Sequence, residues 1–293
     1  MQAWVCKKKG SPKDVLRLEQ NWPKPVPKDG YILVKVHCAA LNPMKAGQGV
    51  LAEYTLVEKR LVDKKPDNVT FEEASTFPVV TLAVFACLKR AGLKKGAGQR
   101  VFINGGSGGL GVCGIQIARA YGAYVVATCS SSSRELVESL GPDEAIDYTT
   151  GNLMDRLAER FSVKEKPFDI VFDTNGSNPE LYRQSPRYLT PTGIFIDPAG
   201  PPRHGGTGAL FAAVGEMLQR YVRPTWLGGV PRQYVFGVLD ENVENQKEVV
   251  ELIKEGKLKA VLDAVYPFEQ TLQAYERHMS GRYVSSLLSF ISK

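Results

Sequence analysis

The sequence predicts an α/β protein built on a doubly wound parallel sheet, with a second, β-rich module contributed by the start of the chain. Strand-like and helix-like segments alternate from residue 100 to residue 240, as in a parallel sheet covered by helices. A glycine-rich turn lies inside the first strand–helix–strand unit of that region. Residues 1–60 instead contain short extended segments and no helix-length amphipathic period.

The composition is that of a globular protein with room for two domains. The chain has 293 residues, and about 150 residues per domain is typical. It is 43% hydrophobic and 23% charged, which argues against a disordered chain. No apolar run approaches the roughly 20 residues that a membrane span needs, and residues 1–5 do not resemble a signal peptide. We therefore expect neither a membrane protein nor a secreted one.

Charge and cysteine content narrow the class further. The net charge of +6 is mild, and the short lysine runs are scattered, which is typical of solvated turns and not of a nucleic-acid surface. The five cysteines are an odd number without disulfide spacing, and most have apolar neighbours. This pattern favours reduced, buried thiols. The sequence thus predicts a cytoplasmic protein without a nucleic-acid partner.

Local patterns place the individual elements. Strands are expected at residues 31–38, 53–57, 100–104, 123–128, 145–147, 168–173, 193–197, 235–239 and 286–291. Helices are expected to begin at residue 71 and to cover residues 79–88, 110–121, 134–140, 153–160, 245–255 and 271–278. For the helix at residue 71, Thr70 is the expected N-cap, and Glu73 completes a capping box. The Gly/Pro-rich residues 198–209 are expected to form a loop.

The glycine turn has the spacing G-x-G-x-x-G. It comprises Gly106, Ser107, Gly108, Gly109, Leu110 and Gly111, between a predicted strand and a predicted helix. Gly106 is expected to permit the tight turn, Gly108 to let a pyrophosphate approach the backbone, and Gly111 to allow close packing of helix and sheet. The helix N-terminus would offer N–H groups to the phosphates. A tight turn in a protein that binds no dinucleotide is the alternative interpretation.

The end of the next strand bears on the choice of cofactor. A protein that binds NAD usually has an acidic residue about 20 residues past the turn, where it contacts the ribose hydroxyls. Residues 128–134 here contain hydroxyl groups, Ser130 among them, and Arg134, with no acid before Glu135. These groups suit the 2′-phosphate of NADPH, so NADPH is expected rather than NADH. One of the serines is also expected to cap the helix that begins near Arg134.

Beyond these patterns, the chain resembles the zinc-free quinone oxidoreductases and enoyl reductases of the medium-chain dehydrogenase/reductase superfamily. The resemblance rests on residues 34–43, 52–54, 104–111, 145–148, 171–176 and 256–258. It implies a Rossmann-type domain between two halves of a GroES-like substrate domain, here residues 1–75, 76–240 and 241–293. It also implies hydride transfer from NADPH to an enone, a quinone or a similar activated double bond.

The resemblance assigns roles to individual residues. Gly106, Gly108, Gly109 and Gly111 would hold the pyrophosphate, and Ser130 and Tyr148 would flank the adenosine phosphate. Asn42 would lie near the nicotinamide and the substrate. Asn175, Gly176, Phe236 and Val238 would line the nicotinamide pocket. Members of this family often form homodimers through the last sheet strand, here near residues 234–238.

One departure from the family pattern concerns the substrate domain. Residues 42–47 run almost directly into residues 49–54, so that about fifty residues of the family's barrel are missing, as judged against the family pattern. We therefore expect a shortened GroES-like domain, whose edge strands are either exposed or covered by a partner.

No zinc site is expected, because the chain has only His37, His204 and His278 and lacks a C-x-x-C motif. Tyr54, Lys45 and His204 are candidate proton donors for an enolate. Each also has a simpler interpretation, as a core strand residue, a solvated lysine and a loop residue. Family members often use solvent for this protonation.

Two other functions stay open. A non-redox biosynthetic enzyme, such as a cyclase or an isomerase, could reuse the scaffold, since the shortened domain changes the cleft. An accessory protein that binds NADPH or a partner enzyme is the third reading.

Overall fold

The computed structural model describes residues 1–8, 10–41, 50–164, 166–176, 178–198, 215, 219–220, 222–237, 242–280 and 288–291. The chain divides into two compact units, Met1–Val80 with Glu241–Lys293, and Thr81–Asp240. The first boundary lies inside α3 (Pro78–Arg90), a few residues after the boundary expected at residue 75. The second boundary falls at residue 240.

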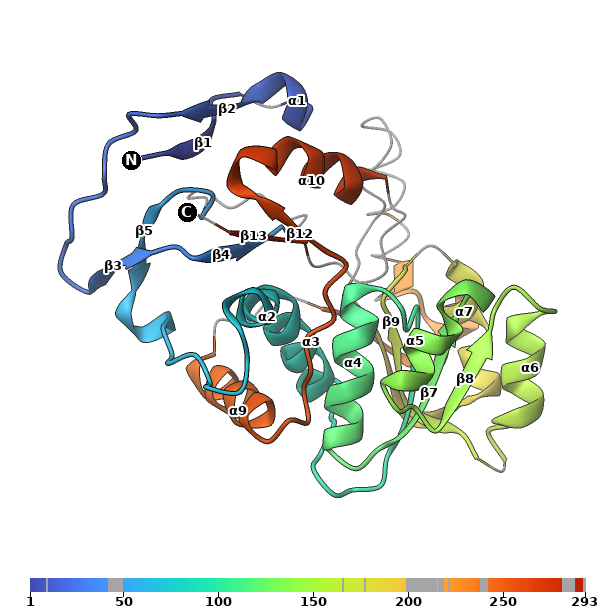
Figure 1. Ribbon diagram of the computed structural model, residues 1–293. Coiled ribbons are helices and arrows are strands. Elements are labelled where there is room, and N and C mark those ends of the chain that lie inside the picture. Colours follow the sequence, from blue (N-terminus) through green and yellow to red (C-terminus); the bar gives the residue numbers. More distant parts are fainter. Residues whose placement is uncertain are drawn as a thin grey trace. The chain divides into compact units, whose positions relative to one another are not determined.

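A six-stranded sheet forms the centre of the unit Thr81–Asp240 (Figure 1). All of its neighbouring strands pair in parallel. From edge to edge the strands are β11 (Gln233–Phe236), β10 (Leu189–Asp197), β9 (Phe168–Asp173), β6 (Arg100–Asn104), β7 (Tyr124–Cys129) and β8 (Glu144–Asp147). Counted along the chain from the β8 edge, this is the order 3-2-1-4-5-6 of doubly wound dinucleotide-binding sheets. The predicted fold class is confirmed.

Helices alternate with these strands, as the sequence pattern predicted. They are α4 (Gly109–Ala120), α5 (Arg134–Ser139), α6 (Leu153–Arg160) and α7 (Pro179–Arg183). Of these, α4 packs against β6 and β7, and α5 packs against β7 and β8. The core between the elements is aromatic: Phe168 lies beside both Phe102 and Phe161, with ring centroids 5.4 and 4.7 Å apart. Apolar burial of this kind supplies most of the stabilisation of such a domain.

Some elements differ from the expected ones. The last strand of the sheet is β11, which ends at Phe236, so the expected strand at residues 235–239 is displaced toward the N-terminus. β10 begins at Leu189, earlier than expected. The short helix α7 was not predicted, because its five residues are too few to show a helical period.

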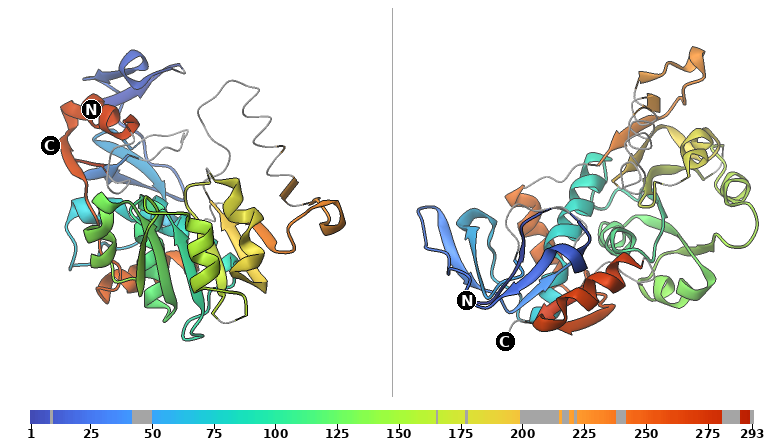
Figure 2. Two further views of the ribbon diagram at one scale, coloured as in Figure 1. Left: turned by 90° about the vertical axis from the view of Figure 1, so that its right-hand side faces the viewer. Right: turned by 90° about the horizontal axis from the view of Figure 1, so that it is seen from above.

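The other unit contains three small sheets in the part of the chain that is described (Figure 2). They pair β1 (Ala3–Cys6) with β2 (Leu16–Glu19), β3 (Tyr31–Lys35) with β5 (Tyr54–Glu58), and β13 (Leu288–Ile291) with both β12 (Ala264–Pro267) and β4 (Cys38–Ala40). The last of these sheets joins the two ends of the chain, because β4 and β13 are antiparallel partners.

Helices complete this unit: α1 (Pro12–Val15), α2 (Phe71–Thr76), α9 (Val243–Lys254) and α10 (Thr271–Met279). The predicted capping box at the start of α2 is confirmed. The Thr70 hydroxyl accepts the N–H of Glu73 at 3.2 Å, and the Glu73 carboxylate accepts the N–H of Thr70 at 2.8 Å. An N-cap of this kind is worth roughly 0.5–2 kcal/mol. α2 packs against β4 and β13, so the cap also fixes the helix that covers the sheet joining both chain ends.

Candidate dinucleotide site

The glycine turn joins the end of β6 to the start of α4. Gly105 is its left-handed residue, with φ +87°. Gly106 lies within the turn, and glycine is needed at this position for space. A Cβ on Gly106 would lie 3.1 Å from the Cβ of Ala127 and 3.2 Å from Cδ1 of Ile115. The turn is pressed against β7 and α4, and a side chain at this position would push them apart.

The other two glycines of the motif differ in what surrounds them. A Cβ on Gly111 would lie 2.1 Å from the carbonyl oxygen of Gly105, so only glycine allows α4 to lie this close to the turn. A Cβ on Gly108 would meet only that same carbonyl oxygen, at 3.6 Å, and Gly108 is exposed. The space beside Gly108 is thus open to a group approaching from solvent, as a phosphate would need.

No side chain caps the start of α4, whose N-cap is Gly108. In contrast, Asn152, Asn178 and Asn242 cap α6, α7 and α9 with their side-chain oxygens. The first N–H groups of a helix have no partner within the helix, and the helix dipole adds partial positive charge there. The start of α4 therefore offers backbone donors to an anion, with Ser107 and Leu110 beside them.

Residues at the end of β7 anchor the turn. The Gly105 N–H donates to the Thr128 hydroxyl at 2.8 Å, and the Gly106 N–H donates to the Thr128 carbonyl at 2.7 Å. Thr128 is fully buried. These two N–H groups hold the turn and are not the donors that a ligand would meet.

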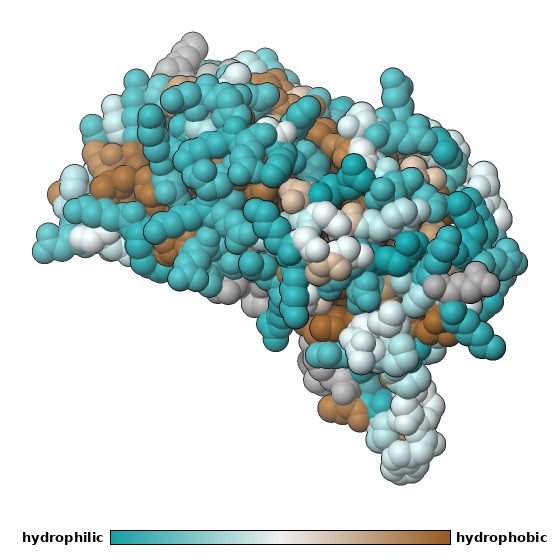
Figure 3. Space-filling model, turned by 90° about the horizontal axis from the view of Figure 1, so that it is seen from below, coloured by the Kyte–Doolittle hydropathy of each residue, from teal (hydrophilic) through white to brown (hydrophobic). Residues whose placement is uncertain are grey.

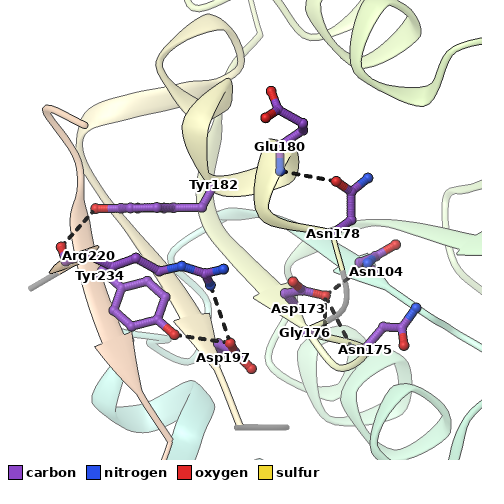
Figure 4. Close-up of polar contacts among 10 residues, drawn as sticks. All are labelled: Asn104, Asp173, Asn175, Gly176, Asn178, Glu180, Tyr182, Asp197, Arg220 and Tyr234. Atoms are coloured by element: carbon purple, nitrogen blue, oxygen red, sulfur yellow. Dashed lines mark hydrogen bonds and ion pairs between the residues drawn. The ribbon is translucent and has the colours of Figure 1, made fainter. Parts of the chain in front are cut away.

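A second turn lies next to the first, at the end of β9. The Asp173 carboxylate oxygen Oδ1 accepts the side-chain N–H of Asn104 at 2.8 Å and the backbone N–H groups of Asn175 and Gly176, each at 3.2 Å (Figure 4). Asp173 is 1% exposed, and Gly176 has φ +64°. The structure thus places the predicted residues Asn175 and Gly176 beside the glycine turn, and a buried carboxylate shapes their backbone.

The serine-rich segment after β7 forms a compact turn. The Ser130 hydroxyl lies 3.0 Å from the Ser132 hydroxyl and 3.2 Å from that of Ser133. No serine side chain caps α5, contrary to our expectation, because residues 131–133 form a 3-10 turn that leads directly into the helix. Nε of Arg134 donates to the Glu138 carboxylate at 2.7 Å, and both side chains are half exposed.

An acidic residue from the neighbouring strand β8, Asp147, lies beside this segment. It was not expected here, because it does not follow β7 in the sequence. Asp147 ends β8 and lies opposite Cys129 of β7. Its carboxylate accepts the Ser131 hydroxyl at 2.5 Å, the Thr149 N–H at 2.8 Å and the Thr149 hydroxyl at 2.6 Å. The hydrogen bonds from Ser131 and then Thr149 lower the pKa of Asp147. Tyr148, which is exposed, follows it directly.

A buried ion pair lies at the end of β10. The Asp197 carboxylate is 3.6 Å from the guanidinium of Arg220 and accepts the Tyr234 hydroxyl at 3.0 Å (Figure 4). The guanidinium also lies over the rings of Tyr182 and Tyr234, 5.9 and 5.4 Å from their centroids. Burial raises the pKa of Tyr234, and the Asp197 charge raises it further, so the hydroxyl stays a proton donor. This cluster ties Arg220 to the sheet.

The remaining predicted site residues fall in different places. Asn42, Lys45 and Val238 lie outside the described residues, as does His204. Tyr54 begins β5 in the first unit. The ammonium of Lys24 lies over its ring, with Nζ 3.8 Å from the ring centroid. Phe236 ends β11 and lies opposite Asp197 of β10. The predicted cofactor residues that are described thus end or follow strands of the six-stranded sheet, from β8 at one edge to β11 at the other, and Tyr54 belongs to the other unit.

The described residues also bear on metals and membranes. Within them, no three His, Cys, Asp or Glu side chains are grouped so that they could hold a metal ion. None of the helices described has the length and apolar character needed to cross a membrane. Hydrophilic side chains cover most of the face seen in Figure 3, and apolar ones lie in scattered patches.

Comparison with known proteins shows which family this chain resembles. Residues 140–284 match a family described as zinc-binding dehydrogenase. The trans-enoyl reductase pgmF of Aspergillus terreus is 33% identical over 239 residues, 80% of this chain and 63% of that protein. The mouse protein NAD(P)H oxidoreductase RTN4IP1, mitochondrial, is 30% identical over 264 residues, 85% of this chain and 64% of that protein. The chain thus spans less than two thirds of the length of these relatives.

Other comparisons extend over nearly the whole chain. The zinc-type alcohol dehydrogenase-like protein C16A3.02c of Schizosaccharomyces pombe is 28% identical over 338 residues, 96% of this chain and 93% of that protein. Among solved structures, the quinone oxidoreductase from Coxiella burnetii superposes with a TM-score of 0.75 at 22% identity. The superposition covers 100% of this chain and 99% of the Coxiella burnetii chain. At that identity the likeness concerns the fold.

Proposed function

Because the chain belongs to the medium-chain dehydrogenase/reductase superfamily, we propose that it is a zinc-independent NADPH oxidoreductase that reduces an enone, a quinone or a similar activated double bond. The observation that carries the proposal is the turn at residues 105–108, which leads into an uncapped helix on a sheet with dinucleotide-binding strand order. The residues around this turn fit a dinucleotide, since the open space at Gly108 lies beside the backbone donors at the start of α4.

The names of two relatives support the reaction class. One is a trans-enoyl reductase, and the other is an NAD(P)H oxidoreductase. When bound, NADPH would supply a hydride to the β-carbon of an enone or to a quinone, and solvent would supply the proton that completes the reduction. The chain's own residues would bind and orient the two reactants.

We assign the halves of the cofactor to the two turns. The pyrophosphate would lie against the backbone N–H groups at the start of α4, beside Gly108. The adenosine end would lie toward Ser130, Arg134 and Tyr148, and the nicotinamide end toward the turn of Asn175 and Gly176. The resemblance also implies nicotinamide-side roles for Phe236, Val238 and Asn42, and these stay predictions. Tyr54 and Lys45 stay candidate proton donors as alternatives to solvent.

The choice of NADPH over NADH rests on the segment after β7. The hydroxyls of Ser130, Ser132 and Ser133 form one cluster there. Arg134 adds a guanidinium, whose Nε–H donates to the Glu138 carboxylate. The nearby Asp147 carboxylate opposes a 2′-phosphate by charge. Its three hydrogen bonds commit it to Ser131 and Thr149 and reduce that opposition. We therefore expect a preference for NADPH that is real but moderate in size.

Zinc independence is proposed on the placement of possible ligands. A zinc site needs three or four ligands around one point, and within the described residues no three His, Cys, Asp or Glu side chains are grouped in this way. Burial raises the pKa of Cys87 and of Cys113 to about 11. Desolvation also raises the pKa of Cys129. Metal analysis of the purified protein tests this point: less than about one tenth of a zinc ion per chain is expected, and stoichiometric zinc would overturn it.

The substrate domain is proposed to be a shortened GroES-like domain made from both ends of the chain. The alignment with the fission yeast relative runs over 338 positions, 45 more than the 293 residues of this chain, so at least that many positions fall opposite gaps. The separate sheets of the described part of this unit agree with an open barrel. Substrate specificity would then differ from that of longer relatives.

We also propose a homodimer through the edge of the six-stranded sheet. β11 is an edge strand, and edge strands present backbone groups to a second chain. Just before it along the chain, the 3-10 turn Thr225–Leu227 projects from the sheet of this unit (Figure 2), and Trp226 on it is 80% exposed. An exposed aromatic next to an open strand edge favours a second copy as the partner.

The first experiment is a calorimetric titration of the purified chain with NADPH and, separately, with NADH. We expect micromolar binding of NADPH and weaker binding of NADH. In Gly108→Val, the added side chain fills the open space and should weaken NADPH at least tenfold, which is about 1.4 kcal/mol. Gly108→Ala serves as the matched control of smaller volume, and circular dichroism verifies that both variants fold. Normal binding by Gly108→Val would falsify the pyrophosphate assignment.

Turnover separates the proposed function from its rivals. Substrate-dependent oxidation of NADPH with enones or quinones is the expected result. Conversion of a substrate without consumption of NADPH would instead indicate a non-redox enzyme built on the scaffold. Binding of NADPH or of a second protein without turnover on any substrate would indicate an accessory protein.

A further inference from the structure

A continuous chain of hydrogen bonds crosses three neighbouring strands at the end of the sheet where the candidate site lies. It begins at the Gly105 N–H, which donates to the Thr128 hydroxyl of β7 at 2.8 Å. That hydroxyl donates to Oδ1 of Asn104 on β6 at 2.9 Å, and Nδ2 of Asn104 donates to Oδ1 of Asp173 on β9 at 2.8 Å. The three side chains are buried, and each has the partner that burial demands.

The chain of hydrogen bonds ends on the second turn. Oδ1 of Asp173 also accepts the N–H groups of Asn175 and Gly176, each at 3.2 Å (Figure 4). One end of the network is therefore an amide of the glycine turn, and the other end is a pair of amides in the turn after β9. A single carboxylate oxygen of Asp173 thus receives three N–H donors, one from a side chain and two from the backbone.

The Thr174 side chain adds a second link between the same turns. Its hydroxyl donates to the Asn104 carbonyl at 2.6 Å and lies 3.3 Å from the Gly105 carbonyl. The Thr174 N–H also donates to the Asn104 carbonyl, at 3.1 Å. A Cβ on Gly105 would lie 2.6 Å from this hydroxyl, so the two turns are in direct contact.

The network lies where the strand order reverses. β6 and β9 are neighbours in the sheet, although two further strands, β7 and β8, lie between them in the sequence. A helix follows β6 and another follows β9, and the crevice between such connections is where doubly wound sheets bind dinucleotides. The Asn104–Asp173 hydrogen bond therefore forms part of the floor of that crevice.

We propose that Asp173 is a positioning residue that locks the glycine turn to the turn of residues 174–176, so that both halves of a dinucleotide meet a backbone fixed in advance. The inference rests on the proposed function for the identity of the ligand, and on the hydrogen bonds alone for the coupling of the turns. Asp173 acts through Asn104, Asn175 and Gly176 and touches no ligand itself. Preorganised backbone donors bind more tightly because their ordering cost is met on folding.

Amide hydrogen exchange on the full chain without ligand tests the coupling. In Asp173→Ala, we expect exchange at both Gly105 and Gly176 to accelerate at least tenfold, although Gly105 belongs to the other turn. Asn104→Ala should accelerate exchange at Gly105 and leave the hydrogen bond from Gly176 to Asp173 in place. The matched control is Asp169→Ala: Asp169 lies at the opposite end of β9 and accepts the N–H of Arg100 on β6 at 2.8 Å. Asp169→Ala should leave the exchange rates of Gly105 and Gly176 unchanged.

Binding of three probes tests the consequence for the ligand. The probes are NADPH, ADP and 2′-AMP, which lacks a pyrophosphate. We expect Asp173→Ala to weaken NADPH at least tenfold, ADP by less, and 2′-AMP not at all. A loss of general stability would weaken all three probes alike, so this order distinguishes positioning from a structural role. Asp173→Asn retains an acceptor and should recover most of the affinity, and it replaces the alanine variant should that variant not fold.

The outcomes separate the two proposals. Acceleration confined to Gly176, or unchanged exchange at both glycines, overturns the coupling. Coupled exchange with unchanged NADPH affinity overturns the positioning role. If the wild-type chain binds none of the three probes, the proposed function fails, and the exchange experiment still decides whether Asp173 joins the turns.

Discussion

Nδ2 of Asn104 lies 2.8 Å from Oδ1 of Asp173, and this contact joins β6 to β9 at the point where the strand order of the sheet reverses. Both side chains directly follow apolar strand residues, and both are buried. The buried amide and the carboxylate satisfy one another, and the carboxylate then holds the turn that follows β9. The candidate site thus depends on a polar contact between strands far apart in the sequence.

Two glycines of the same turn should respond differently to an added methyl group. Gly111→Ala places a Cβ 2.1 Å from a backbone oxygen, and the clash should outweigh the gain of about 1 kcal/mol in helix propensity. We expect a net loss of about 1–3 kcal/mol in the free energy of unfolding. Gly108→Ala, with open space around it, should lose less than about 1 kcal/mol. Urea denaturation of both variants measures this difference. Equal losses in the free energy of unfolding would contradict the geometry of the turn.

The Asp147 carboxylate should make stability depend on acid. Its hydrogen bonds lower its pKa in the folded state, so it contributes stability above the pKa of the unfolded chain, about 3.9, and loses that contribution as the pH falls through the lowered value. Asp147→Asn should therefore be less stable than wild type at pH 7, and the difference should shrink toward pH 2–3. Chemical denaturation across this range is the measurement. A difference that stays constant with pH would show that the charge plays no part.

The pair of Asp197 and Arg220 is expected to matter for stability more than any surface ion pair. Arg220→Ala removes a guanidinium that lies 3.6 Å from the buried Asp197 carboxylate, and the Tyr234 hydrogen bond to that carboxylate stays. Breaking a buried pair in this way costs about 3–5 kcal/mol, and the remaining hydrogen bond favours the lower figure. Arg223→Ala, on an exposed arginine of the same segment, should cost less than about 1 kcal/mol. Thermal unfolding of the two variants tests this contrast.

The proposed dimer can be examined through Trp226. Trp226→Ser removes a large exposed aromatic side chain without touching the core of its own unit. We expect the dimer to dissociate at protein concentrations at least tenfold higher than for wild type, as measured by analytical ultracentrifugation. Trp22→Ser, on a less exposed tryptophan of the other unit, is the control and should not change the association. A wild-type chain that stays monomeric at high concentration would end the proposal.

Features that depend on neighbouring residues alone were predictable from the sequence. The capping box of Thr70 and Glu73 is one, because its two hydrogen bonds close within one helical turn. The alternation of strands and helices is another, because apolar periodicity follows from which side of an element faces the core. The close packing at Gly111 also follows from the motif, since strand, turn and helix are contiguous.

Features of the candidate site were missed where neighbours come from different strands. Asp147 was overlooked because it lies at the end of β8, and only the pairing of β8 with β7 brings it to Ser131. The serine cap of α5 was expected wrongly, because a 3-10 turn precedes the helix. The positive φ of Gly105 was not predicted, since residue spacing does not reveal which glycine takes a positive φ.

By itself, the sequence determined the α/β class, the position of the glycine turn and the family resemblance, because each depends on order along the chain. The tertiary structure alone decided which partners the polar residues at the strand ends meet: Asp173 meets Asn104, Asp147 meets Ser131, and Asp197 meets Arg220. In a parallel sheet the carboxyl ends of all strands lie along the same side of the sheet, and the order of the strands decides which of these ends are neighbours. That order is set by packing over the whole domain, and no local pattern contains it.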